Sequence, residues 1–115
     1  MDVEFFRRGI GKYQVIEIVG DFKNPSDFDR FQKTIHEILG SGCRSIALDF
    51  SQLAYVNSGG LGHLVLCHNR IQEKEAELVF FGASIHVLNV MRMMGLLQMV
   101  EHFSSEVEFR AKAKI

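Results

Sequence analysis

The spacing of apolar residues along this chain switches between two periods, one typical of strands and one typical of helices. Short apolar or alternating runs predict strands at residues 3–8, 13–19, 46–48 and 77–81. Apolar side chains three and four residues apart predict helices from Pro25 to Leu39, with Phe31 on the buried face, and from Ser58 to Glu73. This order predicts an α/β fold, a mixed sheet of about four to five strands with helices packed on it. The 115 residues are expected to form one domain, 1–115.

A further segment, Ile85 to Met94, has the pattern of a helix that is apolar almost all round, with Ser84 as its cap. A helix on the outside of a small sheet normally shows one polar face, so this excess predicts either deep burial or a contact surface. Methionines usually fill cores but also suit adaptable binding surfaces. Met91 and Met94 are therefore predicted to contact a partner.

The last residues give two local signals. Ser105 and Glu108 have the spacing of a capping box, which starts a helix. The alternation of apolar and charged residues from Val107 to Ile115 is typical of a strand. Before them, a short extended piece is expected around Met99.

Residues 45–62 combine the end of a strand, a loop and the start of a helix. Ser58 lies where the N-cap of that helix is expected. Gly59 and Gly60 leave the first N–H groups uncovered, and such a helix start favours anions. A serine hydroxyl at this place is suited to accept a phosphoryl group. The alternative is a serine that only caps the helix.

Asp49 ends the strand beside this helix start. Its carboxylate is expected to accept a hydrogen bond from Ser58 or from loop amides, or simply to form an Asx turn at the strand end. The residues alone leave these alternatives open.

The runs Asp49-Phe50-Ser51 and Val56-Asn57-Ser58-Gly59-Gly60-Leu61-Gly62, with Leu53 between them, resemble the signature of the STAS domain, in particular of bacterial anti-sigma-factor antagonists. That family pattern is a strand ending in Asp-(Phe/Leu)-Ser, an apolar loop, and Asp-Ser-(Ser/Thr)-Gly-Leu-Gly. Ser58 matches the serine that a partner kinase phosphorylates in the regulatory members. Asn57 replaces an aspartate and Gly59 replaces a second hydroxyl residue, so Ser58 is the only acceptor in the run.

The resemblance implies a STAS-like fold, a helix at the C-terminus, and a bacterial signalling protein in transcription regulation. Such a protein binds an anti-sigma factor or serine protein kinase while Ser58 is unmodified, releases it when Ser58 is phosphorylated, and is reset by a serine phosphatase. The residues expected to contact the partner are Asp49, Asn57, Ser58, Gly59, Gly60, Leu61, Met91 and Met94. The alternative is a constitutive STAS adaptor, never phosphorylated, in a transport or signalling assembly.

Composition and the spacing of motifs argue against several other classes of function. A net charge of −1 without a basic stripe argues against nucleic-acid binding. His63 and Cys67 lie four residues apart, but two ligands do not make a zinc site, and the glycine run lacks the lysine of a P-loop. No triad or pair of catalytic carboxylates stands out, so we expect neither enzyme activity nor a metal or cofactor. The two cysteines demand no disulfide, and neither a signal peptide nor an apolar membrane span is expected, which together favour the cytoplasm.

Overall fold

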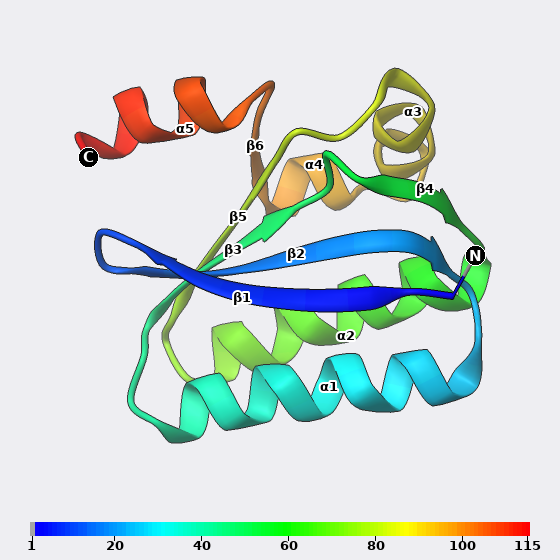
Figure 1. Ribbon diagram of the computed structural model, residues 1–115, viewed down its shortest axis with the longest axis horizontal. Helices are drawn as coiled ribbons and strands as arrows, with labels where there is room; N and C mark the ends of the chain where they lie inside the picture. The colour runs from blue at the N-terminus through cyan, green and yellow to red at the C-terminus, as the bar shows by residue number, and fades with distance from the viewer. Residues whose placement is uncertain (1) are drawn as a thin grey trace.

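The computed structural model describes residues 2–115, whose strands form one six-stranded mixed sheet (Figure 1). The order across the sheet is β1-β2-β3-β5-β6, and β4 pairs with β2 off this path. β1 and β2 form an antiparallel hairpin, and every other pairing is parallel. The strands are β1 (Glu4–Ile10), β2 (Tyr13–Phe22), β3 (Ser45–Asp49), β4 (Leu53–Val56), β5 (Glu77–Phe81) and β6 (Glu101–Phe103). The predicted mixed α/β fold is confirmed, with one strand more than expected.

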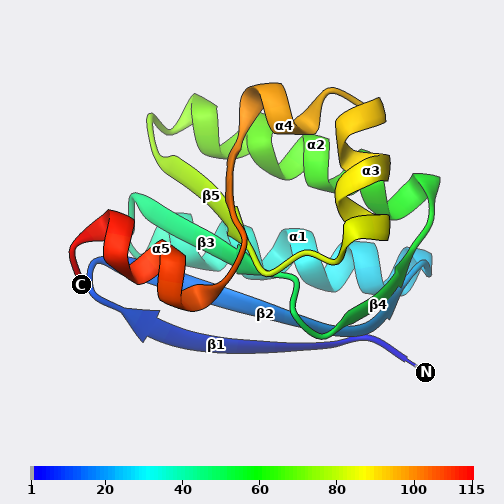
Figure 2. The ribbon, with the colours of Figure 1, turned by 90° about the horizontal axis from the view of Figure 1, so that it is seen from above.

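Helices cover both faces of the sheet (Figures 1 and 2). Successive strand residues point to opposite faces, so Ile46 and Leu48 join a core beneath four helices while Ala47 joins a smaller core on the other face. The four helices are α1 (Pro25–Gly40), α2 (Ser58–Glu73), α3 (Ile85–Met93) and α4 (Leu96–Met99). The smaller core is closed by α5 (Glu106–Ala113) through Phe109, whose side chain is 0% exposed.

The α1 prediction is confirmed in its bounds and in its buried face. Phe31 is fully buried, and its ring lies 5.3 Å from that of Phe22 and 5.8 Å from that of Phe5, measured between ring centroids. The C-terminal helix is confirmed as well, because the Ser105 hydroxyl accepts a hydrogen bond from the N–H of Glu108 at 3.1 Å. The alternation after Val107 therefore does not produce a strand.

Two local predictions are wrong. Residues 53–56 form β4 rather than a loop, because the end of β2 extends to Phe22 and offers them a parallel partner. The expected extended piece around Met99 is the short helix α4, and the strand begins only at Glu101, where it pairs with β5. The first error concerns pairing between segments far apart in the sequence, which local spacing does not encode. The second concerns local hydrogen bonds, such as that from the N–H of Val100 to the carbonyl of Leu96.

Candidate functional site

The start of α2 is capped by Asn57 and not by Ser58, which corrects the sequence prediction. The side-chain oxygen of Asn57 accepts a hydrogen bond from the N–H of Gly60 at 2.8 Å, and its amide nitrogen donates to the carbonyl of Lys23 at 3.1 Å. Asparagine caps as well as serine does, and here it stands one residue earlier. Ser58 is the first helical residue and is exposed, so its hydroxyl is not the capping group.

The glycines at the start of α2 differ in how much room their surroundings leave for a side chain. A Cβ on Gly60 would lie 2.6 Å from the carbonyl oxygen of Phe22 and 2.7 Å from a methyl of Val56, so only glycine lets the helix approach β2 this closely. A Cβ on Gly59 would press on the ring of Phe28 at 2.9 Å, whereas one on Gly62 would meet nothing within 4 Å. Gly60 therefore fixes the position of the Ser58 turn on the sheet.

Several residues predicted to touch a partner lie in the interior. Gly60 is buried, Leu61 is 3% exposed and Met91 is 0% exposed. The surface around the helix start is formed by Ser58, with Asn57 and Gly59 half-buried beside it. Partner contact at these positions stays a prediction, and a partner would reach the three surface residues before it reached the interior ones.

Asp49 lies 2% exposed at the end of β3, turned toward the face that α5 covers. Its carboxylate accepts a hydrogen bond from the N–H of Ser51 at 2.9 Å and forms an ion pair with Arg8 at 3.2 Å. Of the alternatives left open by the sequence, the structure therefore shows the Asx turn, in which the Asp49 carboxylate accepts a hydrogen bond from a loop amide, that of Ser51. Arg8 also binds Glu106, and this hydrogen bond lowers the pKa of the Glu106 carboxyl. Asp49 thus connects β3 to α5 rather than to Ser58.

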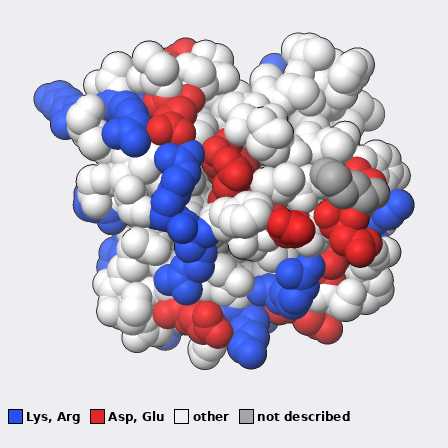
Figure 3. Space-filling view, in the orientation of Figure 1, with Lys and Arg blue, Asp and Glu red and all other residues white. Residues whose placement is uncertain are grey.

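The apolar helix predicted after Ser84 is partly buried and partly exposed, so it has features of both alternatives, deep burial and a contact surface. Val87 and Met91 are buried on the sheet, while other apolar side chains of this segment face outward. We call this exposed set the α3 surface: Ile85 (62% exposed), Val90 (38%), Met93 (87%) and Met94 (43%). Figure 3 shows that the region of α3, at the upper right, is almost free of charged side chains. Such a patch on a small protein is typical of a site that binds another protein.

A cavity of about 230 Å³ joins the α3 surface to the end of β4. Its lining is mostly apolar and consists of Ala54, Tyr55, Val56, His86, Val87 and Val90. Val56 lies two residues before Ser58 in the chain, so the cavity lies against the strand that leads into α2. The sequence prediction did not include the exposed Tyr55 among the contact residues; the continuous apolar run over residues 53–56 was a signal for a strand but not for the exposure of Tyr55.

His63 does not pair with Cys67 as a metal site would require. The His63 ring stacks on Phe28 at 4.6 Å, and Gln32 contacts both its Nδ1 and its backbone carbonyl, at 3.2 and 2.9 Å. Cys67 is fully buried, and burial raises the pKa of its thiol. Within residues 2–115 no group of three or more His, Cys, Asp or Glu side chains is placed to hold a metal ion. Over the same residues, no helix has both the length and the apolar character needed to cross a bilayer.

Comparison with solved structures shows the same fold in proteins of low sequence identity. A putative anti-sigma factor antagonist from Thermotoga maritima aligns with a TM-score of 0.85 at 17% identity, over 96% of this chain and 95% of its own. The phosphorylated form of the Bacillus cell fate determinant SpoIIAA aligns at 0.75 and 16%, over 96% and 99%. A sulfate transporter family protein from Wolinella succinogenes aligns at 0.79 and 16%, over 91% and 87%.

A comparison with the sequences of curated proteins finds no match. The family model described as "Mlab, STAS domain" matches residues 7–101, which include four of the six strands in full and the whole start of α2. Because this match covers most of the chain, the fold and the sequence signature agree on one assignment: the chain belongs to the STAS domain family.

Proposed function

We propose that this protein is a phosphorylation-regulated binding protein of the anti-sigma-factor-antagonist type, not an enzyme, that acts in the bacterial cytoplasm. It binds an anti-sigma factor or serine protein kinase while Ser58 is unmodified and releases it when Ser58 carries a phosphoryl group. A serine phosphatase restores the binding form. The observation that carries this proposal is the exposed Ser58 hydroxyl at the start of α2, left free because Asn57 makes the cap.

A phosphoryl group at this position is compatible with the folded chain. The first N–H groups of an α-helix have no acceptor inside the helix, and the positive end of the dipole favours an anion. The modification adds about −1.5 to −2 charge at neutral pH. That charge would stand two residues along the chain from Val56, which lines the apolar cavity, and it would oppose a close apolar contact between a partner and this part of the surface. Phosphorylation therefore changes recognition while the helix persists.

The test is a kinase reaction followed by intact-mass measurement. The protein is incubated with ATP and the serine kinase encoded nearest to it, and a mass increase of one phosphoryl group is expected for wild type and none for Ser58→Ala. Ser26→Ala is the matched control, because Ser26 is also exposed and also lies in the first turn of a helix, α1. Equal phosphorylation of wild type and Ser58→Ala would remove the proposal.

A second candidate is a constitutive adaptor subunit of a transport or signalling assembly. Asn57 and Gly59 depart from the family's phosphosite pattern, and the fold is shared with a sulfate transporter family protein. In this function Ser58 stays unmodified and the α3 surface holds a permanent partner. Intact mass of protein isolated from cells separates the two, since only the regulated form gives a phosphorylated species that Ser58→Ala abolishes.

A further inference from the structure

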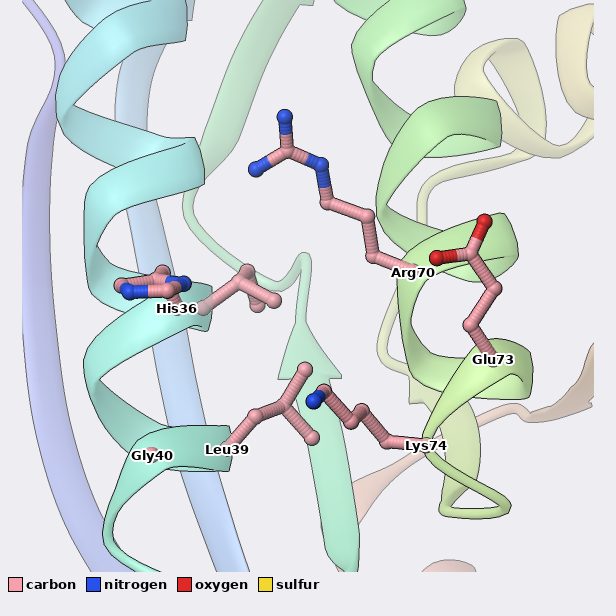
Figure 4. A pocket seen from close by; sticks show the side chains of 7 residues that line it. His36, Leu39, Gly40, Arg70, Glu73 and Lys74 are labelled. Atoms are coloured by element: carbon pink, nitrogen blue, oxygen red, sulfur yellow. The ribbon is translucent and has the colours of Figure 1, made fainter.

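A cleft lies between the second halves of α1 and α2, away from the proposed partner site (Figure 4). It has a volume of about 260 Å³ and is lined by Ile35, His36, Leu39, Gly40, Arg70, Glu73 and Lys74. At a rise of 1.5 Å per residue, Arg70 stands roughly 18 Å along α2 from Ser58. The cleft is therefore a separate feature from the Ser58 surface.

The floor of the cleft is apolar and comes from α1. Ile35 is 0% exposed and Leu39 is 7% exposed, yet both line the cleft. Gly40 closes the helix without a side chain, and a Cβ placed there would meet nothing within 4 Å, so this end of the cleft is open. Because Ile35 is closed to water, an apolar group in the cleft would cover chiefly the exposed part of Leu39, and its gain is proportional to the area covered.

The wall of the cleft on α2 carries two cations. Arg70 lies in the last turn of α2 and Lys74 is the C-cap residue of this helix. Figure 4 shows Arg70 reaching toward α1 and Lys74 pointing toward Leu39, at the other end of the cleft. Neither takes part in any of the ion pairs formed among residues 2–115. The dipole of α2 favours basic residues near its end, but it does not account for the open apolar floor beside them.

We propose that this cleft binds a small monocarboxylate that carries an aliphatic chain. The Arg70 guanidinium has the planar geometry that suits a carboxylate, and Lys74 adds a second positive charge at the Leu39 end of the cleft. The chain lies against Leu39, the apolar lining residue that is still partly open. Glu73 adds one negative charge to the same lining, which disfavours dianions such as phosphate monoesters. The volume is just below the usual lower limit of about 300 Å³ for ligand pockets, which favours a chain of medium length.

The test uses octanoate as the probe and amide chemical shifts of the ¹⁵N-labelled protein as the readout. Octanoate is expected to produce saturable shifts confined to residues 35–40 and 70–74. Acetate, which has the carboxylate alone, and octan-1-ol, which has the chain alone, are both expected to bind much more weakly. Arg70→Gln should weaken octanoate binding about tenfold or more, the usual loss for a charged hydrogen bond. Lys74→Gln is a second variant that tests the same wall.

Lys33→Gln is the matched control, because it removes the same charge from an exposed site on α1 that does not line the cleft. It should bind octanoate as wild type does, and so should Ser58→Ala, which keeps this test independent of the proposed function. Octanoate binding that is unchanged in both Arg70→Gln and Lys74→Gln would overturn the proposal. So would shifts spread over the whole protein, or octan-1-ol binding as tightly as octanoate.

Discussion

The carboxamide oxygen of Asn57 accepts a hydrogen bond from the backbone N–H of Gly60 across 2.8 Å, whereas the next residue, Ser58, is exposed and does not make this cap. The cap and the candidate phosphoacceptor are therefore two adjacent residues rather than one. As a result, a change at Ser58 leaves the hydrogen bond that starts α2 intact. Stability and recognition at this site are expected to respond to different substitutions.

Asn57→Ala should lower the free energy of unfolding by about 0.5–2 kcal/mol, because it removes the cap and leaves a helix-start N–H without its acceptor. Ser58→Ala should change it by no more than about 0.5 kcal/mol, as for an ordinary surface position. Asn57→Asp should stay close to wild type, since aspartate caps equally well. Urea unfolding of the three variants measures this. A loss in Ser58→Ala as large as that in Asn57→Ala would mean that Ser58 supports the helix start after all.

Ser58→Asp should weaken partner binding without loss of stability. A carboxylate in the first turn of α2 interacts favourably with the helix dipole, by about 0.3–1 kcal/mol. The same charge stands two residues along the chain from Val56, which lines the apolar cavity, and opposes a close apolar contact with this part of the surface. Titration calorimetry with the cognate anti-sigma factor or kinase should show wild type and Ser58→Ala binding alike and Ser58→Asp binding more weakly. Equal affinities for all three would favour the constitutive adaptor.

Gly60→Ala should destabilise the protein by about 1–3 kcal/mol, the usual cost of forcing an added group into a packed site. The added Cβ would lie 2.6 Å from the backbone oxygen of Phe22, which is not free to move. Gly62→Ala is the matched control on the same helix, because the added Cβ would meet nothing within 4 Å. It should stabilise the helix by up to about 1 kcal/mol. Thermal melts of the two variants are expected to move in opposite directions from wild type.

Met93→Glu should abolish or strongly weaken partner binding if the α3 surface is the contact surface. Met93 is 87% exposed, so the substitution should leave stability within about 0.5 kcal/mol of wild type. Val107→Glu is the control: Val107 is 78% exposed on α5, at the opposite face of the sheet. Pull-down with the cognate partner should separate the two variants. Equal retention of partner by both would place the contact elsewhere.

His102 should make stability fall in mild acid. It is half-buried at β6, its Nε2 accepts a hydrogen bond from the N–H of Ala83 at 3.2 Å, and burial lowers its pKa while nearby Glu108 acts in the opposite direction. The unfolded chain then binds a proton more readily than the folded one, so this contribution is complete above the unfolded pKa of about 6.5 and is lost as pH falls below it. His102→Gln keeps an acceptor but removes the titration. Urea unfolding from about pH 8 to about pH 5 should show a shallower decline for His102→Gln than for wild type.

Much of the fold follows from local signals in the sequence. The apolar stripe through Phe31 defines α1, the pair Ser105 and Glu108 starts α5, and the run around Ser58 places a helix after a buried strand. Each signal depends on residues within one or two helical turns of each other. Such signals are legible without the rest of the chain because the hydrogen bonds and stripes they describe are made within one element.

The tertiary structure decided what depends on distant segments. β4 exists because the end of β2 lies beside residues 53–56, and Gly60 and Leu61 are interior because α2 packs against Phe22 and Val56. The apolar excess of the third helix could not be divided into core and surface from the sequence, since burial of Met91 and exposure of Met93 depend on how the helix is rotated against the sheet. Local spacing sets which residues share a face of a helix, whereas only packing sets what each face meets.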